Sequence, residues 1–245
     1  MHNRVLVAVA HGSADPRASA TIAELAALAR EREQGLDLRI AFLGHAPPSL
    51  PQVLSTIGAD REVTVLPLLL TAAYHSKADI PRMLARMPRT RGPRLSYGAT
   101  LGPHPLLLDA LERRLVEADP GADPAATAVV LAAAGSSDPE ANATIARMAA
   151  QWQARTGWFA VRPAYASAAE PSPAAAVTGL LRDGAPRVVV ATYLLAPGLF
   201  ADRIRHAALA AGAAVVSPAL GACAEVADVM LGRFAQTGST GRTAA

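Results

Sequence analysis

The amino-acid sequence predicts an α/β protein made of two duplicated halves, each a four-stranded parallel sheet flanked by helices. Short apolar runs alternate with amphipathic segments along the chain, a long motif occurs twice, and a stretch rich in Pro, Gly and Asp lies between the two copies. Such alternation is typical of parallel sheets covered by helices. A chain of 245 residues is long enough for one large domain or two of about 120 residues each.

The duplicated motif starts at Gly12 and again at Gly135. Residues 12–23 and 135–146 are identical at nine of twelve positions, with an offset of 123. The same offset takes Asp79 onto Asp202. The linker composition of residues 118–124 favours a boundary there. We therefore expect an N-terminal half over 1–118 that holds the functional site, a C-terminal half over 127–235, and a disordered Gly-, Ser- and Thr-rich tail over 236–245.

The elements of the first half follow from periodicity and turn chemistry. Asp15 and Pro16 are typical of an N-cap and a first helical position, and Asp138 and Pro139 repeat the pair. In the common strand order 2-1-3-4, the first and third strands are neighbours. Strands are expected over 4–10, 37–43, 62–70 and 94–98, and helices over 17–33, 49–58, 78–87 and 104–117.

Composition argues against several classes of function. The chain is 51% hydrophobic and 18% charged, as in compact globular proteins. No apolar stretch approaches the roughly 20 residues of a membrane span, and the first apolar run lacks a cleavage pattern. A net charge of +3 without a basic run gives no support to nucleic-acid binding. The single cysteine, Cys223, excludes an intramolecular disulfide and favours a cytoplasmic protein.

Two histidines follow strands that should be neighbours. His11 directly follows the first strand, and His75 follows the third after a short exit segment. Ligands of doubly wound sheets bind at the carboxyl ends of the strands, so both imidazoles should reach one crevice. Two neutral imidazoles suit a divalent ion such as Fe²⁺, Co²⁺, Ni²⁺ or Zn²⁺.

The duplication provides an internal control for these histidines. Under the offset of 123, His11 corresponds to Ala134 and His75 to Gly198. The motif around the first position is retained in both copies, whereas the histidines occur only in the first. A histidine required for folding would be expected twice, so the divergence favours a functional role.

These segments resemble a known enzyme family. The run HGSADPR over 11–17, the run PLLLTAAYH over 67–75 and LGPHP over 101–105 are similar to the sirohydrochlorin cobalto- and ferrochelatases in their long bacterial form. The resemblance covers roughly residues 4–235 and implies two chelatase-like (flavodoxin-like) halves. It also implies a class II chelatase, a metal-ion lyase that works without ATP or an organic cofactor.

The implied reaction is insertion of Co²⁺ or Fe²⁺, with Ni²⁺ also permitted, into sirohydrochlorin during siroheme or cobalamin synthesis. His11 and His75 would hold the metal and carry the catalysis, because insertion releases two pyrrole protons and imidazole can accept a proton near neutral pH. Substrate carboxylates require cationic or amide donors. The candidates for these donors are Ser13, Arg17, Ser76, Lys77 and His104.

The sequence departs from the family pattern at one position. Relatives usually carry a glutamate in a Phe-Leu-Glu context, whereas Phe42-Leu43 is followed here by Gly44-His45. We hypothesise that His45 is a third metal ligand or base. The alternative is a site with two imidazoles and a water molecule.

Other functions fit the sequence less well. A non-catalytic protein that binds and delivers metal or tetrapyrrole is the nearest alternative. A phosphate-transfer enzyme with a histidine nucleophile would require Arg-His-Gly, whereas the chain has Ala10-His11-Gly12. A monomer is expected, since two fused halves supply the interface that a single half would form by dimerising. The sequence leaves the physiological metal and the pathway open.

Overall fold

The chain folds into two compact units. One consists of Met1–His104 with Ala222–Ala245, and the other of Pro105–Gly221. The structure, a computed structural model, describes residues 3–72, 79–86 and 92–240, with side chains up to residue 237. Within these ranges no helix combines the length and apolar character that crossing a membrane requires.

The first unit is built on a parallel sheet in the order β2-β1-β3-β4, which confirms the expected order. The central strand β1 has a continuous apolar run that is buried on both faces, as expected for a strand covered by helices on both sides. Leu6 of β1 lies opposite Leu38 of β2 and Thr64 of β3. The strands are β1 (Arg4–Ala10), β2 (Asp37–Phe42), β3 (Glu62–Pro67) and β4 (Arg94–Tyr97).

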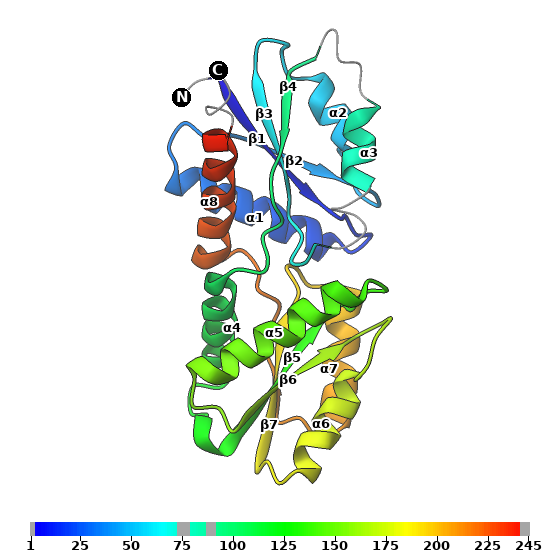
Figure 1. The fold of residues 1–245 in the computed structure, drawn as a ribbon, viewed down its shortest axis with the longest axis vertical. Helices are drawn as coiled ribbons and strands as arrows, with labels where there is room; N and C mark the ends of the chain where they lie inside the picture. The colour runs from blue at the N-terminus through cyan, green and yellow to red at the C-terminus, as the bar shows by residue number, and fades with distance from the viewer. Residues whose placement is uncertain (1–2, 73–78, 87–91, 241–245) are drawn as a thin grey trace. The chain divides into compact units, whose positions relative to one another are not determined.

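Two helices cover each face of this sheet. On one face, α2 (Leu50–Ser55) and α3 (Ile80–Ala85) bury their apolar side chains against alternate residues of β1 and β3. On the other face, α1 (Pro16–Arg32) packs against β2 and against α8 (Ala224–Thr240), which also contacts β3. Figure 1 shows α8 beside α1.

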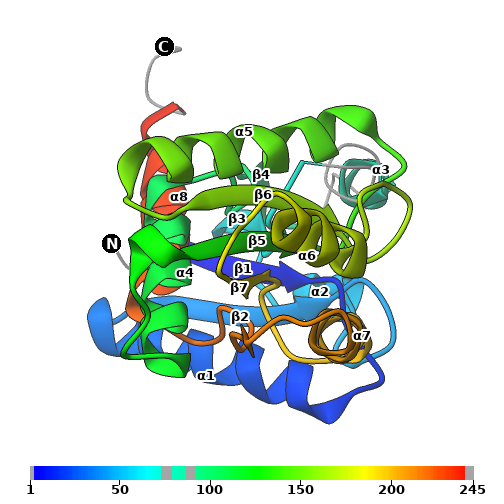
Figure 2. The same cartoon turned by 90° about the horizontal axis from the view of Figure 1, so that it is seen from below.

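The second unit repeats this architecture with the order β6-β5-β7-β8, of which Figure 2 shows β6, β5 and β7. Helices α6 and α7 cover one face, and α4 and α5 the other. The strands are β5 (Thr127–Ala133), β6 (Ala160–Tyr165), β7 (Arg187–Tyr193) and β8 (Val215–Val216), and the helices are α4 (Pro105–Ala118), α5 (Pro139–Arg155), α6 (Pro173–Arg182) and α7 (Leu199–Ala210), with a short 3-10 turn, η2 (Pro124–Ala126).

The compact units do not coincide with the halves expected from the repeat. Helix α4 ends the first copy of the repeat, yet it packs against β7 and β8 of the second unit. Helix α8 ends the second copy and packs in the first unit. An amphipathic helix needs an apolar face to cover, and its own sequence does not specify which sheet provides that face.

The expectation of a disordered tail over 236–245 is wrong for residues 236–240. Helix α8 includes residues 236–240, because the Gly and Ser residues near its end continue a helix that is anchored upstream by buried Val226, Met230 and Phe234. Residues 241–245 lie outside the described part of the chain.

Candidate functional site

The exits of β1 and β2 are tied together by backbone hydrogen bonds. Leu43 N donates to Ala10 O at 3.0 Å, and Gly44 N donates to His11 O at 3.2 Å. Gly12 has φ +87°, and a Cβ atom there would lie 1.7 Å from Gly44 O. Only glycine allows this approach, which brings the segment after His11 against the segment after β2.

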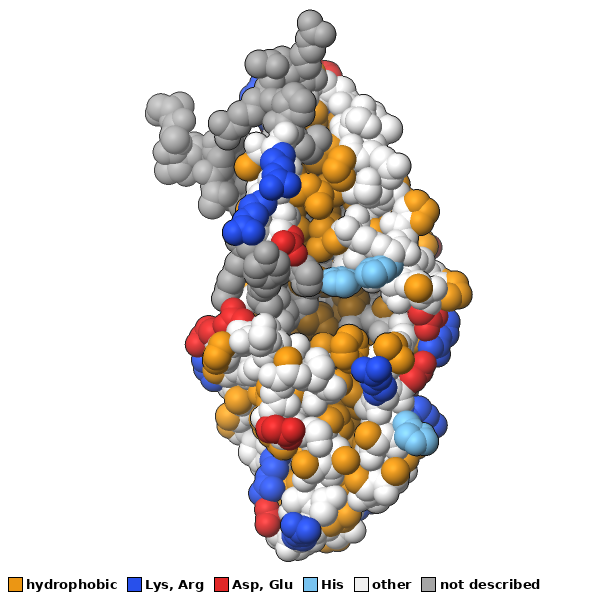
Figure 3. Space-filling view, turned by 90° about the vertical axis from the view of Figure 1, so that its right-hand side faces the viewer, with side chains coloured by type: hydrophobic (Ala, Val, Ile, Leu, Met, Phe, Trp, Pro, Cys, Tyr) orange, Lys and Arg blue, Asp and Glu red, His pale blue; other side chains and the backbone are white. Residues whose placement is uncertain are grey.

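This approach places two imidazoles side by side. The ring centroids of His11 and His45 are 6.3 Å apart, with an angle of 16° between the ring planes. Both residues are exposed, and Figure 3 shows an adjacent pair of histidine side chains on the surface. His45 has φ 61°, a left-handed conformation that is uncommon for residues other than glycine.

A local contact favours one tautomer of His11. Its Nδ1 lies 3.1 Å from Gly12 O. When Nδ1 carries the proton and donates to this carbonyl, Nε2 keeps a lone pair that can bind a metal or accept a proton. The described ranges contain no group of three or more His, Cys, Asp or Glu side chains arranged to hold a metal ion.

His75, the residue expected to share a site with His11, is not among the described residues. Ser76 and Lys77 also fall outside the described residues. The strand pairing on which their expected place depends is present, because Val9 of β1 lies opposite Pro67 of β3.

Ser13 and Arg17 belong to the cap of α1. Ser13 Oγ accepts from Asp15 N at 3.0 Å, and the Asp15 carboxylate accepts from Arg17 N at 2.9 Å. The Arg17 side chain also pairs with Asp15, at 2.6 Å. The side-chain hydrogen bond from Arg17 lowers the pKa of Asp15. Arg17 therefore lies at the start of α1 as part of an ion pair, not as an isolated cation.

His104 lies at the end of the first unit, directly before α4. It is half-buried and follows the cis peptide bond between Gly102 and Pro103. Arg233 of α8 donates to Pro103 O at 3.2 Å. These contacts fix the backbone around His104 and assign no chemical role to its side chain.

The second unit keeps the loop but not the imidazoles. Gly135 has φ +84°, and a Cβ there would lie 1.9 Å from Ser167 O. Ala134 and Ala168 stand where the first unit has His11 and His45, and Ala168 retains the left-handed φ, at 58°. Sequence reasoning did not use the pairing of His45 with Ala168, although the offset of 123 already contained it.

The two loops differ in how their amides are satisfied. In the second unit Asn142 Oδ1 accepts from Ser136 N at 3.0 Å, and Asn142 Nδ2 donates to Ser136 O at 2.7 Å. The corresponding residue of the first unit is Ser19. In the described part of the chain the Ser13 amide has no acceptor, so this donor is open beside His11.

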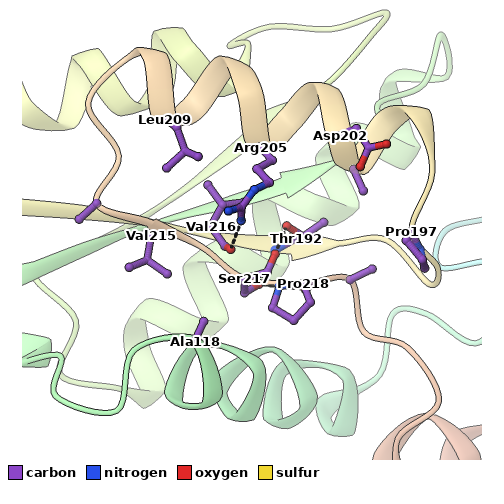
Figure 4. Close-up of a pocket in the computed structure, with 13 residues that line it drawn as sticks. Ala118, Thr192, Pro197, Asp202, Arg205, Leu209, Val215, Val216, Ser217 and Pro218 are labelled. Carbon is purple, nitrogen blue, oxygen red and sulfur yellow. Dashed lines mark hydrogen bonds between the residues drawn. The ribbon is translucent and has the colours of Figure 1, made fainter.

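The second unit also contains a cavity of about 520 Å³ between α7 and the edge strand β8. Figure 4 shows Arg205 above it, donating at 3.5 Å to Val216 O. Thr192 and Ser217 line the cavity and are hydrogen-bonded to each other, with Thr192 Oγ1 donating to Ser217 O at 2.8 Å. These polar groups of the cavity therefore form hydrogen bonds with other residues that line it.

Comparison with known families identifies the family of both copies. The model of the CbiX family matches residues 5–118 and again 128–237, so both copies of the repeat are recognised. This finding confirms the resemblance inferred from the motifs.

Two curated relatives and one solved structure are similar to the chain. The sirohydrochlorin cobaltochelatase of Priestia megaterium is 27% identical over 81% of this chain, and the sirohydrochlorin ferrochelatase of Bacillus subtilis (strain 168) is 30% identical over 59%. The alignments span 66% and 55% of these two relatives. The structure of SirB from Bacillus subtilis with Fe³⁺ superimposes with a TM-score of 0.81 at 25% identity, over 98% of both chains.

Proposed function

Because the chain belongs to the CbiX family, we propose that it inserts a divalent metal, Co²⁺ or Fe²⁺, into sirohydrochlorin without ATP, as a metal-ion lyase. The observation that carries the proposal is the pair of imidazoles, His11 and His45, at the carboxyl edge of the first sheet. The second unit repeats the backbone of this edge without either histidine. The names of the two relatives support both metals. Ni²⁺ is a further candidate, since its ligand preferences are close to theirs.

His11 and His75 are the proposed metal ligands and catalytic residues, with His45 as a third ligand or base. Insertion exchanges two pyrrole protons for one divalent cation, so two protons must leave the ring. Neutral imidazoles bind borderline divalent ions and accept protons near neutral pH. In this proposal His45 takes the place of the glutamate that the family resemblance implies after the second strand.

Substrate carboxylates are proposed to bind near the start of α1. The open amide of Ser13, two residues before the N-cap of α1, supports a contact to a carboxylate, because a backbone N–H without an acceptor can donate a charge-assisted hydrogen bond to an anion. Arg17, Ser76, Lys77 and His104 are proposed as further contacts.

The first experiment measures the absorbance change of metal-free sirohydrochlorin with Co²⁺ or Fe²⁺. Wild type should accelerate insertion, and His11→Ala and His75→Ala should each lower the rate by about 100-fold or more, as expected for loss of a ligand that also transfers protons. The matched control is His206→Ala, which removes an exposed histidine of the second unit and should leave the rate unchanged. A wild-type rate equal to the spontaneous rate would refute the proposal.

His45 is tested by two substitutions. His45→Ala should weaken metal binding by about 10- to 100-fold, the range for loss of a supporting group at a metal site. His45→Glu, which supplies a carboxylate, should recover much of this loss. Unchanged metal affinity and rate in His45→Ala would remove His45 from the site.

A second candidate function is a non-catalytic carrier of metal or tetrapyrrole. Gly44 and His45 provide no carboxylate where the family resemblance implies a glutamate. If His45 does not act as a base in its place, the protein binds its ligand without catalysing insertion. A carrier would bind pigment or metal without increasing the insertion rate. The proposed chelatase is a monomer that needs no organic cofactor, and the fused repeat supports the monomer. We place it in a reducing cytoplasm, which the single buried thiol of Cys223 supports.

A further inference from the structure

Helix α7 exposes large apolar side chains at its start. Leu199 is 62% exposed and Phe200 is 39% exposed. They follow Gly198, which corresponds to His75 in the first copy, so Leu199 and Phe200 occupy the positions of Ser76 and Lys77. Isolated exposed apolar residues are ordinary, but an adjacent pair at the carboxyl edge of a parallel sheet lies where ligands of such sheets bind.

A cation completes this group. Arg203 lies three residues after Phe200 and four after Leu199, so the three side chains share one face of the helix. Arg203 is exposed, and in the described part of the chain its guanidinium makes no hydrogen bond or ion pair. The first copy has buried Ile80 at this position. We call Leu199, Phe200 and Arg203 the open face of α7.

The other faces of α7 are already in use. Ile204 and Ala208 are buried against the sheet. Arg205 and Leu209 line the cavity beside β8 (Figure 4). The open face is therefore distinct from the cavity, and the residues described around it leave it to solvent.

We propose that the open face of α7 binds the tetrapyrrole, an inference that rests on the proposed function and assigns its substrate a surface in the second unit. The ring of sirohydrochlorin is a broad apolar surface with carboxylates around its rim. Leu199 and Phe200 cover part of the ring, and Arg203 pairs with a carboxylate. The two copies have thus diverged, since the first carries His11 and His45 where the second has Ala134 and Ala168, and the second carries Leu199, Phe200 and Arg203 where the first has Ser76, Lys77 and Ile80.

The test is binding of metal-free sirohydrochlorin to the full-length protein, followed by the absorbance and fluorescence of the pigment. The double variant Leu199→Ser with Phe200→Ser should raise the Kd about tenfold or more, as expected for loss of two apolar contacts including an aromatic ring. Arg203→Gln should also raise the Kd, and Arg203→Lys should recover part of the loss, because the charge is retained. Co²⁺ affinity in the absence of pigment should stay at the wild-type value in all three variants.

Leu209→Ser is the matched control, because Leu209 is 40% exposed on the same helix but faces the cavity. It should bind pigment like wild type. Equal Kd values for wild type and the double variant, or an equal loss in Leu209→Ser, would overturn the proposal, and so would a wild-type protein that binds no pigment. If wild type binds pigment through this face but does not accelerate insertion, the surface stands and the chelatase function fails.

Discussion

At the scale of single residues, Gly12 decides whether the two histidines can meet. Its backbone φ of +87° and the position of Gly44 O both exclude a side chain. Gly12→Ala should destabilise the protein by about 1–3 kcal/mol, the usual cost of forcing extra atoms into a packed site. It should also lower the insertion rate per folded molecule, because His11 and the loop of His45 are pushed apart.

Substitutions at two other glycines distinguish the loss of stability from the loss of activity. Gly135→Ala creates the same clash in the second unit and should reduce stability with little change in the rate per folded molecule. Gly35 has φ +78° but nothing within 4 Å of an added Cβ, so Gly35→Ala should cost only about 1–2 kcal/mol for the left-handed backbone. Denaturant unfolding with parallel assays checks all three variants. Full activity in folded Gly12→Ala would contradict the role given to this contact.

Ser19 tests whether the open amide of Ser13 contacts substrate. Ser19→Asn introduces the side chain that closes the equivalent loop through Asn142. We expect a higher KM for sirohydrochlorin with kcat nearly unchanged, since the asparagine competes for a donor that only binds substrate. The reverse change, Asn142→Ser, should leave KM unchanged and reduce stability by about 1 kcal/mol. A wild-type KM in Ser19→Asn would mean that the amide does not contact substrate.

At the scale of elements, the carboxylate of Glu112 joins α4 to two tryptophan side chains, one of which belongs to α5. Glu112 Oε2 accepts from the indole N–H groups of Trp152, at 2.7 Å, and Trp158, at 3.1 Å. Both tryptophans are buried, so removing the acceptor leaves two unpaired donors. Glu112→Ala should destabilise the second unit by about 1–3 kcal/mol per lost partner and shift the tryptophan emission. Glu112→Gln, which keeps a carbonyl acceptor, should lose less stability than Glu112→Ala. Equal losses of stability in the two variants would show that the two hydrogen bonds do not stabilise the unit.

The start of α1 has a pH dependence with a definite sign. The pKa of Asp15 is lowered chiefly by its side-chain hydrogen bond from Arg17. A carboxyl with a lowered pKa in the folded state contributes stability above its unfolded value near 3.8, and this contribution is lost as the pH falls through the folded value. Asp15→Asn keeps a capping oxygen but removes the charge. Its melting temperature should be lower than that of wild type at neutral pH and converge with it as the pH falls through the lowered pKa of Asp15 in the folded state; a constant gap would contradict the ion-pair explanation.

At the scale of the whole molecule, the two copies exchange their last helices. Helix α8 returns to the first unit, where Phe234 O accepts from Arg4 at 2.9 Å and the Phe234 ring lies under the Arg4 guanidinium. Arg32 of α1 pairs with Asp228 of α8 at 3.5 Å. The first unit therefore depends on the two ends of the chain, whereas the second is one continuous segment.

This exchange predicts which fragments fold. The fragment 105–221 contains the whole second unit and should unfold cooperatively, as measured by circular dichroism with increasing urea. The fragment 127–235, which follows the sequence repeat, lacks α4 and should show no such transition, because the face of β7 and β8 that α4 covers would be exposed. A cooperative transition in 127–235 and none in 105–221 would contradict the exchange.

The sequence by itself determined the features that depend on local pattern. Apolar runs and the Asp-Pro caps located the strands and helices, and the repeat with its lost histidines singled out His11 and His75, because periodicity and turn chemistry act over a few residues. The tertiary structure decided what depends on distant segments. The meeting of His11 with His45 requires β1 to pair with β2 and Gly12 to pass Gly44. The exchange of α4 and α8 could not be predicted, since an amphipathic helix fits either sheet until the connections around it are fixed in space.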